Sequence, residues 1–253
     1  MVDKIKNAHK KVKIALVVKY TQLHDAYLSV EESIFHAASA LDAKAEILWI
    51  DSEKITTKNV KETLKDADGL VIPGGFGVRG IEGMIDAAKY ARENNIPCLG
   101  ICLGMQVMVI EYARHVLGFK DANSSEFDPK TTHPVIDLMP EQVKIIAKGA
   151  TMRLGSYPCS LEENSLARSL YKKDMIAERH RHRYEFNNIY REDYLANGLK
   201  LSGLSPDKKL VEIVECPSRR YHIGSQFHPE FKSRPTKPHP LFVGLISAAL
   251  KGK

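Results

Sequence analysis

The sequence predicts a single α/β domain with a mainly parallel sheet flanked by helices, and a smaller region of antiparallel strands in its second half. Three observations predict this fold. The first half alternates short apolar runs, typical of buried strands, with longer segments of helical spacing. Within 97–106 a strand gives way to a helix at a cysteine framed by glycines. From about residue 123 the alternation changes to loops and shorter strands.

Each expected element rests on a local pattern: short apolar runs indicate strands, and apolar residues repeating every three or four positions indicate helices. In order, we expect a strand at 12–18, a helix at 28–41, a strand at 45–51, a helix at 58–65, a strand at 69–72, a helix at 82–93, a strand at 96–101 and a helix at 103–117. The second half adds strands at 178–187, 210–214 and 221–226 and a helix at 241–250. Alternating strands and helices form parallel sheets, whose active sites lie at the carboxyl ends of the strands.

The positive charge of the chain is concentrated at its start. The formal net charge is +6, and five lysines with one aspartate supply +4 of it within the first thirteen residues. Such a segment beside a nearly neutral remainder is more typical of a solvated tail or linker than of a nucleic-acid surface. We therefore predict a basic linker or tail at 1–11, one domain at 12–253, and no nucleic acid as a partner.

Composition excludes several other classes of protein. No stretch resembles a signal peptide, and the apolar run at 241–250 is too short to cross a bilayer. The cysteines at 98, 102, 159 and 216 lack the paired spacing of zinc ligands. We expect a cytoplasmic protein with reduced thiols, no metal site and no membrane partner.

Cys102 stands between Gly100 and Gly104, where the strand at 96–101 meets the next helix. A Gly-x-Cys-x-Gly turn at this place predicts a nucleophile elbow. The glycines leave room for a sharp turn, and the helix N-terminus stabilises negative charge on sulfur. A buried structural cysteine is the alternative, and the glycine frame favours the nucleophile.

His228 and Glu230 flank Pro229 just after the apolar segment 221–226. In an extended chain, side chains two positions apart project to the same side, so the carboxylate is expected to hold the imidazole. A thiol nucleophile requires such a base, and the base requires an orienting acid. The sequence thus predicts a triad of Cys102, His228 and Glu230; an ordinary turn is the alternative explanation of His-Pro-Glu.

A glycine loop at 75–80 matches the dinucleotide pattern Gly-x-Gly-x-x-Gly. It follows the third expected strand where a dinucleotide fold uses the first, and the next strand ends at Cys102 where a ribose-binding acid is required. No P-loop sequence is present. We therefore expect Gly74 and Gly75 to turn backbone N–H groups toward the thiol, as an oxyanion hole requires.

Together, the elbow, the His-Pro-Glu segment and the Pro-Gly-Gly loop resemble the class I, or triad, glutamine amidotransferases, whose fold is flavodoxin-like. Longer segments are similar to the glutaminase domain of the CTP synthase family. They are PGGFGVRGIEGM (73–84), LGICLGMQ (99–106), EYARHVLG (111–118), DANSSEFDP (121–129), ERHRHRYEFN (178–187) and QFHPEFKSRP (226–235). One departure is Val18, which stands where that family usually has glycine and leaves open the shape of the turn near Lys19.

The resemblance implies a role for each site residue. Cys102 is the nucleophile, His228 the base and Glu230 its orienting acid, with oxyanion donors at the backbone of Gly75 and Leu103. The implied glutamine-binding residues are Gly75, Leu103, Gln106, Glu126 and Arg183. A guanidinium suits the substrate carboxylate and a carboxylate suits its ammonium group.

The same resemblance implies partners and cofactors beyond this chain. L-Glutamine is the substrate, and the ammonia aminates UTP to CTP in a synthase domain that this sequence lacks, as expected of a ligase of pyrimidine biosynthesis. The glutaminase domain needs no cofactor, whereas the complete enzyme is expected to use ATP and Mg, with GTP as activator. The isolated domain is expected to be a monomer and the complete enzyme an oligomer.

Two other functions remain open from the sequence. Another class I amidotransferase, of the GMP synthetase or carbamoyl phosphate synthetase type, shares the triad, but the Phe-Gly-Val-Arg-Gly loop argues against it. A non-catalytic RNA-binding module would use the basic start and the Arg-His run at 179–183. Alternation along a strand places Arg179, Arg181 and Arg183 on one face and the two histidines on the other, which dilutes a continuous basic surface.

Overall fold

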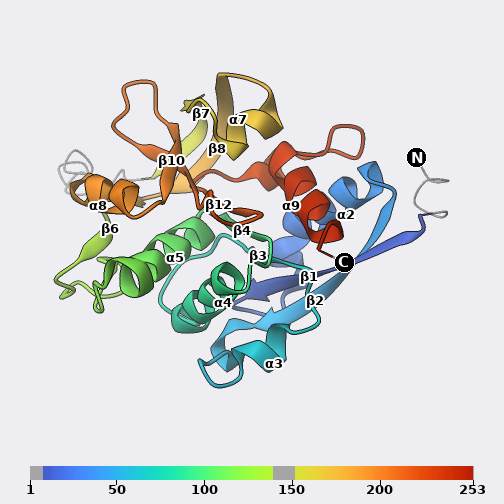
Figure 1. Cartoon of the computed structure of the whole chain (residues 1–253), viewed down its shortest axis with the longest axis horizontal. Helices are drawn as coiled ribbons and strands as arrows, with labels where there is room; N and C mark the ends of the chain where they lie inside the picture. Colours follow the sequence, from blue (N-terminus) through green and yellow to red (C-terminus); the bar gives the residue numbers. More distant parts are fainter. Residues whose placement is uncertain (1–7, 139–151, 253) are drawn as a thin grey trace.

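One large sheet runs through the protein and positions the candidate site. The structure is a computed structural model that describes residues 8–138 and 152–252 (Figure 1). In the described residues, nine strands form this sheet in the order β2-β1-β3-β4-β12-β11-β10-β7-β8. Their bounds are β1 Lys10–Val18, β2 Ala43–Asp51, β3 Gly69–Ile72, β4 Cys98–Ile101, β7 Arg153–Leu161, β8 Met175–His182, β10 Lys200–Leu204, β11 Val211–Glu215 and β12 His222–Ser225.

The sheet has a parallel half and an antiparallel half. Strands β2, β1, β3, β4 and β12 pair in parallel, whereas β12, β11, β10, β7 and β8 pair antiparallel. The antiparallel strands therefore extend the parallel sheet at the edge beyond β12. This arrangement confirms the predicted α/β fold with a mainly parallel sheet and an added antiparallel region.

Helices cover both faces of the parallel half. The helical elements are η1 His24–Tyr27, α2 Leu28–Ala40, η2 Ser52–Lys54, α3 Val60–Leu64, α4 Ile81–Glu93, α5 Leu103–Tyr112, η3 Ala113–Leu117, α7 Leu166–Tyr171, η4 Asn188–Tyr190, α8 Arg191–Ala196, η5 Pro229–Phe231 and α9 Pro240–Leu250. Helices α4 and α5 pack on one face, and α2 and α9 pack on the other (Figure 1).

Strand residues alternate between two hydrophobic cores. In β1, Ala15 and Val17 face the core with α4 and α5, whereas Ile14 and Leu16 face the core with α2 and α9. All four side chains are fully buried. A strand buried on both sides reads as a continuous apolar run, which is why this strand was predictable from sequence.

A smaller sheet lies beside the main one, where β5 Asn123–Ser124, β6 Pro134–Leu138 and β9 Tyr184–Phe186 pair. The predicted strand at 178–187 is two strands, because the chain bends at Arg183 and leaves the large sheet for the small one. The predicted helix at 103–117 is α-helical from Leu103 to Tyr112 and π-helical from Ala113 to Leu117. The helix expected at 58–65 is shorter, at Val60–Leu64.

Short elements of the second half were not predicted. They are β7, α7, α8 and β10. Each helix here has six residues, which is too few to show a clear helical period in sequence. The basic segment expected at 1–11 lies mostly outside the described residues, and β1 begins within it at Lys10.

Candidate functional site

Cys102 occupies the sharp turn between β4 and α5. Its φ of 52° and ψ of −102° lie outside the regions that L-residues favour, and it is the N-cap residue of α5. Such strain at a non-glycine residue is typical of functional sites. The side chain is only 3% exposed. The elbow predicted from sequence is therefore present, with the sulfur at a helix N-terminus where negative charge is stabilised.

The glycines of the elbow allow close packing of backbone against backbone. A Cβ at Gly104 would lie 1.9 Å from the carbonyl oxygen of Ile72, at the end of β3. A Cβ at Gly100 would lie 2.5 Å from Sδ of Met108. These separations are too short for real carbon contacts, so α5 approaches the sheet only because both positions lack side chains.

His228 lies close to Cys102 because β12 is the parallel neighbour of β4. Ser225 pairs with Ile101 at the carboxyl ends of the two strands, and its carbonyl accepts the N–H of Cys102 at 2.7 Å. The backbone N–H of His228 in turn donates to the carbonyl of Arg179 in β8 at 2.8 Å. Three strands therefore fix the positions of the thiol and the imidazole.

Glu230 holds the imidazole, although not through an extended chain. Nδ1 of His228 and Oε1 of Glu230 are 2.7 Å apart, and both residues are buried. The expected extended geometry is wrong, because Pro229–Phe231 forms a 3-10 turn that brings the carboxylate to Nδ1 at the edge of the ring. Phe231 stacks on the imidazole with ring centroids 4.8 Å apart.

The electrostatics of this pair favour an imidazolium ion. Burial lowers the pKa of His228, but hydrogen bonding and charge from Cys102 and Glu230 outweigh that effect and raise the pKa from 6.5 to about 10. Nε2, the ring nitrogen on the side away from Glu230, makes no hydrogen bond of good geometry within the described residues. An imidazolium nitrogen therefore remains available beside the sulfur to a reacting group.

A cavity of about 400 Å³ opens onto Cys102. Its lining contains Gly75, Gln106, Glu126 and Arg183, four of the five predicted glutamine-binding residues. Leu103, the fifth, is buried behind this lining, and its Cδ2 lies 3.2 Å from the Cβ position of Gly75. The remaining lining residues are Phe76, Met152, Arg181, His182 and Tyr184. A volume of this size suits an amino acid or another small polar ligand.

Gly74 brings the glycine loop against the two reactive side chains. A Cβ at Gly74 would lie 2.8 Å from Cε1 of His228 and 3.6 Å from Cβ of Cys102. Any side chain here would push on the imidazole. The loop therefore lies against Cys102 and His228, and the orientation of its N–H groups toward the thiol stays a prediction.

Lys19 is a site residue that sequence reasoning missed. Its ammonium group donates to the carbonyl oxygens of Phe76 and Gly77, and so supports the glycine loop from the end of β1. Burial lowers its pKa to about 8, while the charge of Glu126 opposes that effect. A lysine directly after a buried strand, at the carboxyl edge of the sheet, was the signal available in the sequence. Val18, the residue before Lys19, is fully buried. The contact of Lys19 with the loop therefore forms without the glycine that the CTP synthase family usually has at position 18.

Gln226 is a second missed residue. Its Nε2 lies 3.8 Å from the sulfur of Cys102, and its Oε1 accepts from Nε2 of Gln106 at 3.3 Å. Gln106 also donates to the carbonyl of Tyr184 at 3.0 Å. The amide of Gln106 is thus held inside the protein, where it braces the cavity wall.

The histidines of the Arg-His run are interior residues. His180 and His182 are 3% and 2% exposed, and their rings contact each other through Nδ1 and Nε2 at 2.9 Å. Burial, together with the charge of Arg153, lowers the pKa of His182 to about 3 and lowers that of His180 further. Both imidazoles are neutral, so the run does not form a continuous basic surface.

The other three cysteines are buried and free. Burial, with a contribution from Glu111, raises the pKa of Cys98 to about 12, and burial also raises that of Cys159. Neither thiol is therefore a nucleophile at neutral pH. In the described part of the chain, no cluster of three or more His, Cys, Asp or Glu side chains is arranged to hold a metal ion.

Long apolar helices are absent from residues 8–138 and 152–252: none of their helices has the length and hydropathy to span a bilayer.

Comparison with known proteins agrees with this geometry. The family model for glutamine amidotransferase class-I matches residues 22–248. The chain belongs to the class I glutamine amidotransferase family.

Within that family, the chain is similar to the CTP synthases. It is 59% identical over 253 residues to CTP synthase of Clostridium kluyveri and 54% identical over 251 residues to that of Geobacillus kaustophilus. These alignments cover 100% and 99% of this chain but 47% of each relative, so the chain spans about half the length of the CTP synthases it matches.

Solved structures support the same assignment. The glutaminase domain of Trypanosoma brucei CTPS with bound acivicin superposes with a TM-score of 0.90 and 41% identity, over 95% of this chain and 94% of that one. A putative GMP synthase protein from Thermoplasma acidophilum, with a TM-score of 0.60 and 18% identity, shares the fold alone. The chain thus has the fold of the CTP synthase glutaminase domain, as the sequence predicted.

Proposed function

We propose that this chain hydrolyses L-glutamine to glutamate and ammonia through Cys102, His228 and Glu230. The observation that carries the proposal is the contact of the buried imidazole with Glu230 at 2.7 Å, beside a thiol in a strained turn. A carboxylate, an imidazole and a thiol in this order form a nucleophilic triad. The cavity of about 400 Å³ that opens onto the sulfur is suited to an amino acid substrate.

The first half of the reaction forms a thioester. The Cys102 thiolate attacks the side-chain amide carbon of glutamine, and the amide oxygen becomes an oxyanion. Backbone N–H groups of Gly75 and Leu103 stabilise this oxyanion, since both residues adjoin the thiol. The His228 imidazolium gives its Nε2 proton to the amide nitrogen, and the C–N bond breaks to release ammonia.

The second half returns the enzyme to its starting state. Neutral His228 takes a proton from water, and the resulting hydroxide attacks the γ-glutamyl thioester. The C–S bond breaks, glutamate leaves, and the thiolate–imidazolium pair is restored. Glu230 stays ionised throughout and stabilises the imidazolium.

The charges of the cavity wall suit the α-amino acid end of glutamine. Arg183 is proposed to bind the α-carboxylate, because a guanidinium can form two parallel hydrogen bonds with it. Glu126, whose carboxylate also accepts the N–H of Gly77 at 3.3 Å, is proposed to bind the ammonium group. Gln106 braces the wall between them.

We further propose that the ammonia serves CTP synthesis in a longer protein. High identity to CTP synthases over about half their length supports this role. The ATP, Mg and UTP sites would then lie in a synthase domain, with GTP as an activator, and none of them is assigned to residues of this chain. Oligomerisation of the complete enzyme and its location in the cytoplasm belong to the same proposal.

The chemistry can be tested with acivicin, a glutamine-like electrophile. We expect an adduct confined to Cys102 by peptide mass spectrometry, and none in Cys102→Ser. Cys216→Ser is the matched control and should be labelled like the wild type, since that thiol is also buried but lies outside the cavity lining. An adduct elsewhere, or no adduct on folded protein at neutral pH, would contradict the proposed triad.

A further inference from the structure

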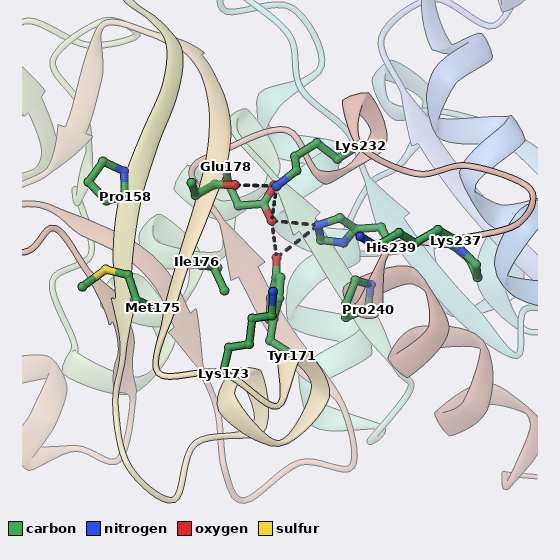
Figure 2. A pocket seen from close by; sticks show the side chains of 12 residues that line it. Pro158, Tyr171, Lys173, Met175, Ile176, Glu178, Lys232, Lys237, His239 and Pro240 are labelled. Carbon is green, nitrogen blue, oxygen red and sulfur yellow. Dashed lines mark hydrogen bonds and ion pairs between the residues drawn. The ribbon is translucent and has the colours of Figure 1, made fainter.

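A buried carboxylate in β8 has donors on one oxygen only. Glu178 is 1% exposed, and its Oε1 lies 3.2 Å from the hydroxyl of Tyr171, 3.3 Å from Nε2 of His239 and 3.4 Å from Nζ of Lys232 (Figure 2). Burial and the charge of Glu178 raise the pKa of Tyr171 well above 10, so its hydroxyl stays protonated. Nδ1 of His239 accepts the N–H of Leu241, which leaves hydrogen on Nε2, and Nε2 also lies 3.1 Å from the hydroxyl oxygen of Tyr171. Three donors therefore converge on Oε1.

The second oxygen has no such partner. Oε2 of Glu178 is buried and makes no hydrogen bond within the described residues. A buried carboxylate oxygen without a donor is unfavourable, because desolvation is not compensated. Lys232, whose side chain is 41% exposed, lies over this carboxylate from the loop that follows η5 (Figure 2). Its ammonium group also donates to the carbonyl oxygen of Ala177, so movement of this side chain would break that hydrogen bond and open the carboxylate to a donor from outside.

The cluster is the floor of a cavity distinct from the one at Cys102. This cleft has a volume of about 670 Å³, against about 400 Å³ for the cavity at Cys102. Its walls carry apolar side chains and its rim carries three lysines. The apolar lining is Pro158, Met175, Ile176, Ala177, Pro238 and Pro240, and the lysines are Lys173, Lys232 and Lys237.

This cleft is separate from the glutamine cavity. The two share no lining residue. Both touch β8, but Glu178 and His182 are four residues apart, which is roughly 13 Å along a strand. The proposed glutaminase reaction uses none of the residues on this floor or rim.

We propose that the cleft binds a small organic anion with an apolar body and a hydrogen-bond donor, such as an amino group, at its far end. The anionic group is placed at the rim, since its three lysines are exposed and Glu178 is the one acidic residue in the lining. The apolar body packs against Met175 and Ile176. The donor displaces Lys232 from Glu178 and completes the hydrogen bonding of Oε2. Each part of the ligand is thus complementary to one part of the cleft.

The proposal can be tested with 5-aminonaphthalene-1-sulfonate, which has an amine and a sulfonate on opposite sides of an aromatic body. Naphthalene-1-sulfonate, which lacks the amine, is the matched probe. We expect saturable binding by calorimetry, with the amine-bearing probe about tenfold tighter, since one hydrogen bond to a charged group is worth that much. Glu178→Gln should abolish this difference between the probes.

Rim and wall variants locate the binding. Met175→Glu, at a position 51% exposed, should weaken the amine-bearing probe at least about tenfold, and Lys237→Gln should weaken it several-fold. Lys61→Gln, in exposed α3, should leave it unchanged. Protein alkylated at Cys102 should bind as tightly as untreated protein, which separates this proposal from the glutaminase chemistry.

Several outcomes would overturn the inference. They are an absence of saturable binding in the millimolar range, equal affinity of wild-type protein for both probes, unchanged affinity in Met175→Glu and Lys237→Gln, and loss of binding after Cys102 is alkylated. Near-ultraviolet circular dichroism checks that Glu178→Gln is folded. If Glu178→Gln does not fold, Met175→Glu still tests the proposal, because it alters only the exposed wall.

Discussion

Replacing Glu230 by Gln tests how much of the reactivity at Cys102 depends on one buried negative charge. The substitution preserves the shape of the side chain, and its amide oxygen can still accept from Nδ1 of His228. It removes one of the two negative partners that raise the pKa of His228 from 6.5 to about 10. Any loss of reactivity therefore reports the charge of the carboxylate more than the geometry of the ring.

The size of the effect follows from the pKa. A rise from 6.5 to about 10 corresponds to about 5 kcal/mol in favour of the imidazolium, at about 1.4 kcal/mol per tenfold change. That preference is what remains after the opposing effect of burial, and interactions with both Cys102 and Glu230 produce it. If half depends on Glu230, its loss costs about 2 to 3 kcal/mol. We expect the rate of reaction to fall by about 10²-fold, and the loss of a triad carboxylate elsewhere reaches about 10⁴-fold.

The assay is the pseudo-first-order rate at which acivicin modifies Cys102, followed by mass spectrometry from pH 5.5 to 10.5. A raised pKa keeps the imidazolium charged up to about pH 10, so the wild-type rate should fall only near that pH. In Glu230→Gln this fall should move toward pH 6.5, because the carboxylate no longer supports the charge. Glu62→Gln, on a side chain that is 75% exposed, is the control and should behave as the wild type.

Two results would refute this reasoning. One is a decrease of less than about threefold at pH 7.5, which is too small for the loss of a charge in direct contact with the imidazole. The other is a basic limb that remains near pH 10 in the variant. Either would mean that Glu230 does not set the charge of His228.

Three further substitutions test two glycine contacts near the site and one buried ion pair between α4 and α5. Gly74→Ala should slow acivicin labelling by about 10²-fold with little change in the melting temperature, because the added methyl lies 2.8 Å from the imidazole of the proposed triad. Gly104→Ala should lower the free energy of unfolding in urea by about 3 kcal/mol, since its Cβ would lie 1.9 Å from the carbonyl oxygen of Ile72; an effect below 1 kcal/mol would contradict that packing. Arg92→Met should cost about 3 to 5 kcal/mol in the same assay, because it leaves the fully buried Glu111 without the guanidinium 2.8 Å away, and replacing both residues by Met should restore much of the loss.

The central strands of the parallel half were predictable because they are buried on both faces. Strands β1, β3 and β4 each contain an apolar run of four or five residues, and a helical period follows most of them. The elbow was equally visible, since only glycines permit the turn at Cys102 and the contact of α5 with Ile72. Local chemistry fixes these features, so one sequence was enough.

The antiparallel half was harder to predict for a physical reason. Strands β7 and β10 contain glycine and serine, and β7 also contains proline, so neither shows a continuous apolar run. The six-residue helices α7 and α8 are stabilised by packing more than by propensity. The bend at Arg183, which splits the predicted strand at 178–187, likewise follows from pairing with β6.

For the site, the sequence by itself identified the candidate side chains: a cysteine in a glycine-framed turn, a histidine beside a glutamate, and an alternation that separates three arginines from two histidines. Tertiary structure alone decided how they meet. Parallel pairing of β4 with β12 places the thiol by the imidazole, and a 3-10 turn brings Glu230 to Nδ1 of that ring. Lys19 and Gln226 join from the ends of other strands. The contacts of Lys19 with Phe76 and of Gln226 with Cys102 join residues 57 and 124 positions apart. No local pattern encodes such pairing, because its free energy comes from burying the whole sheet at once.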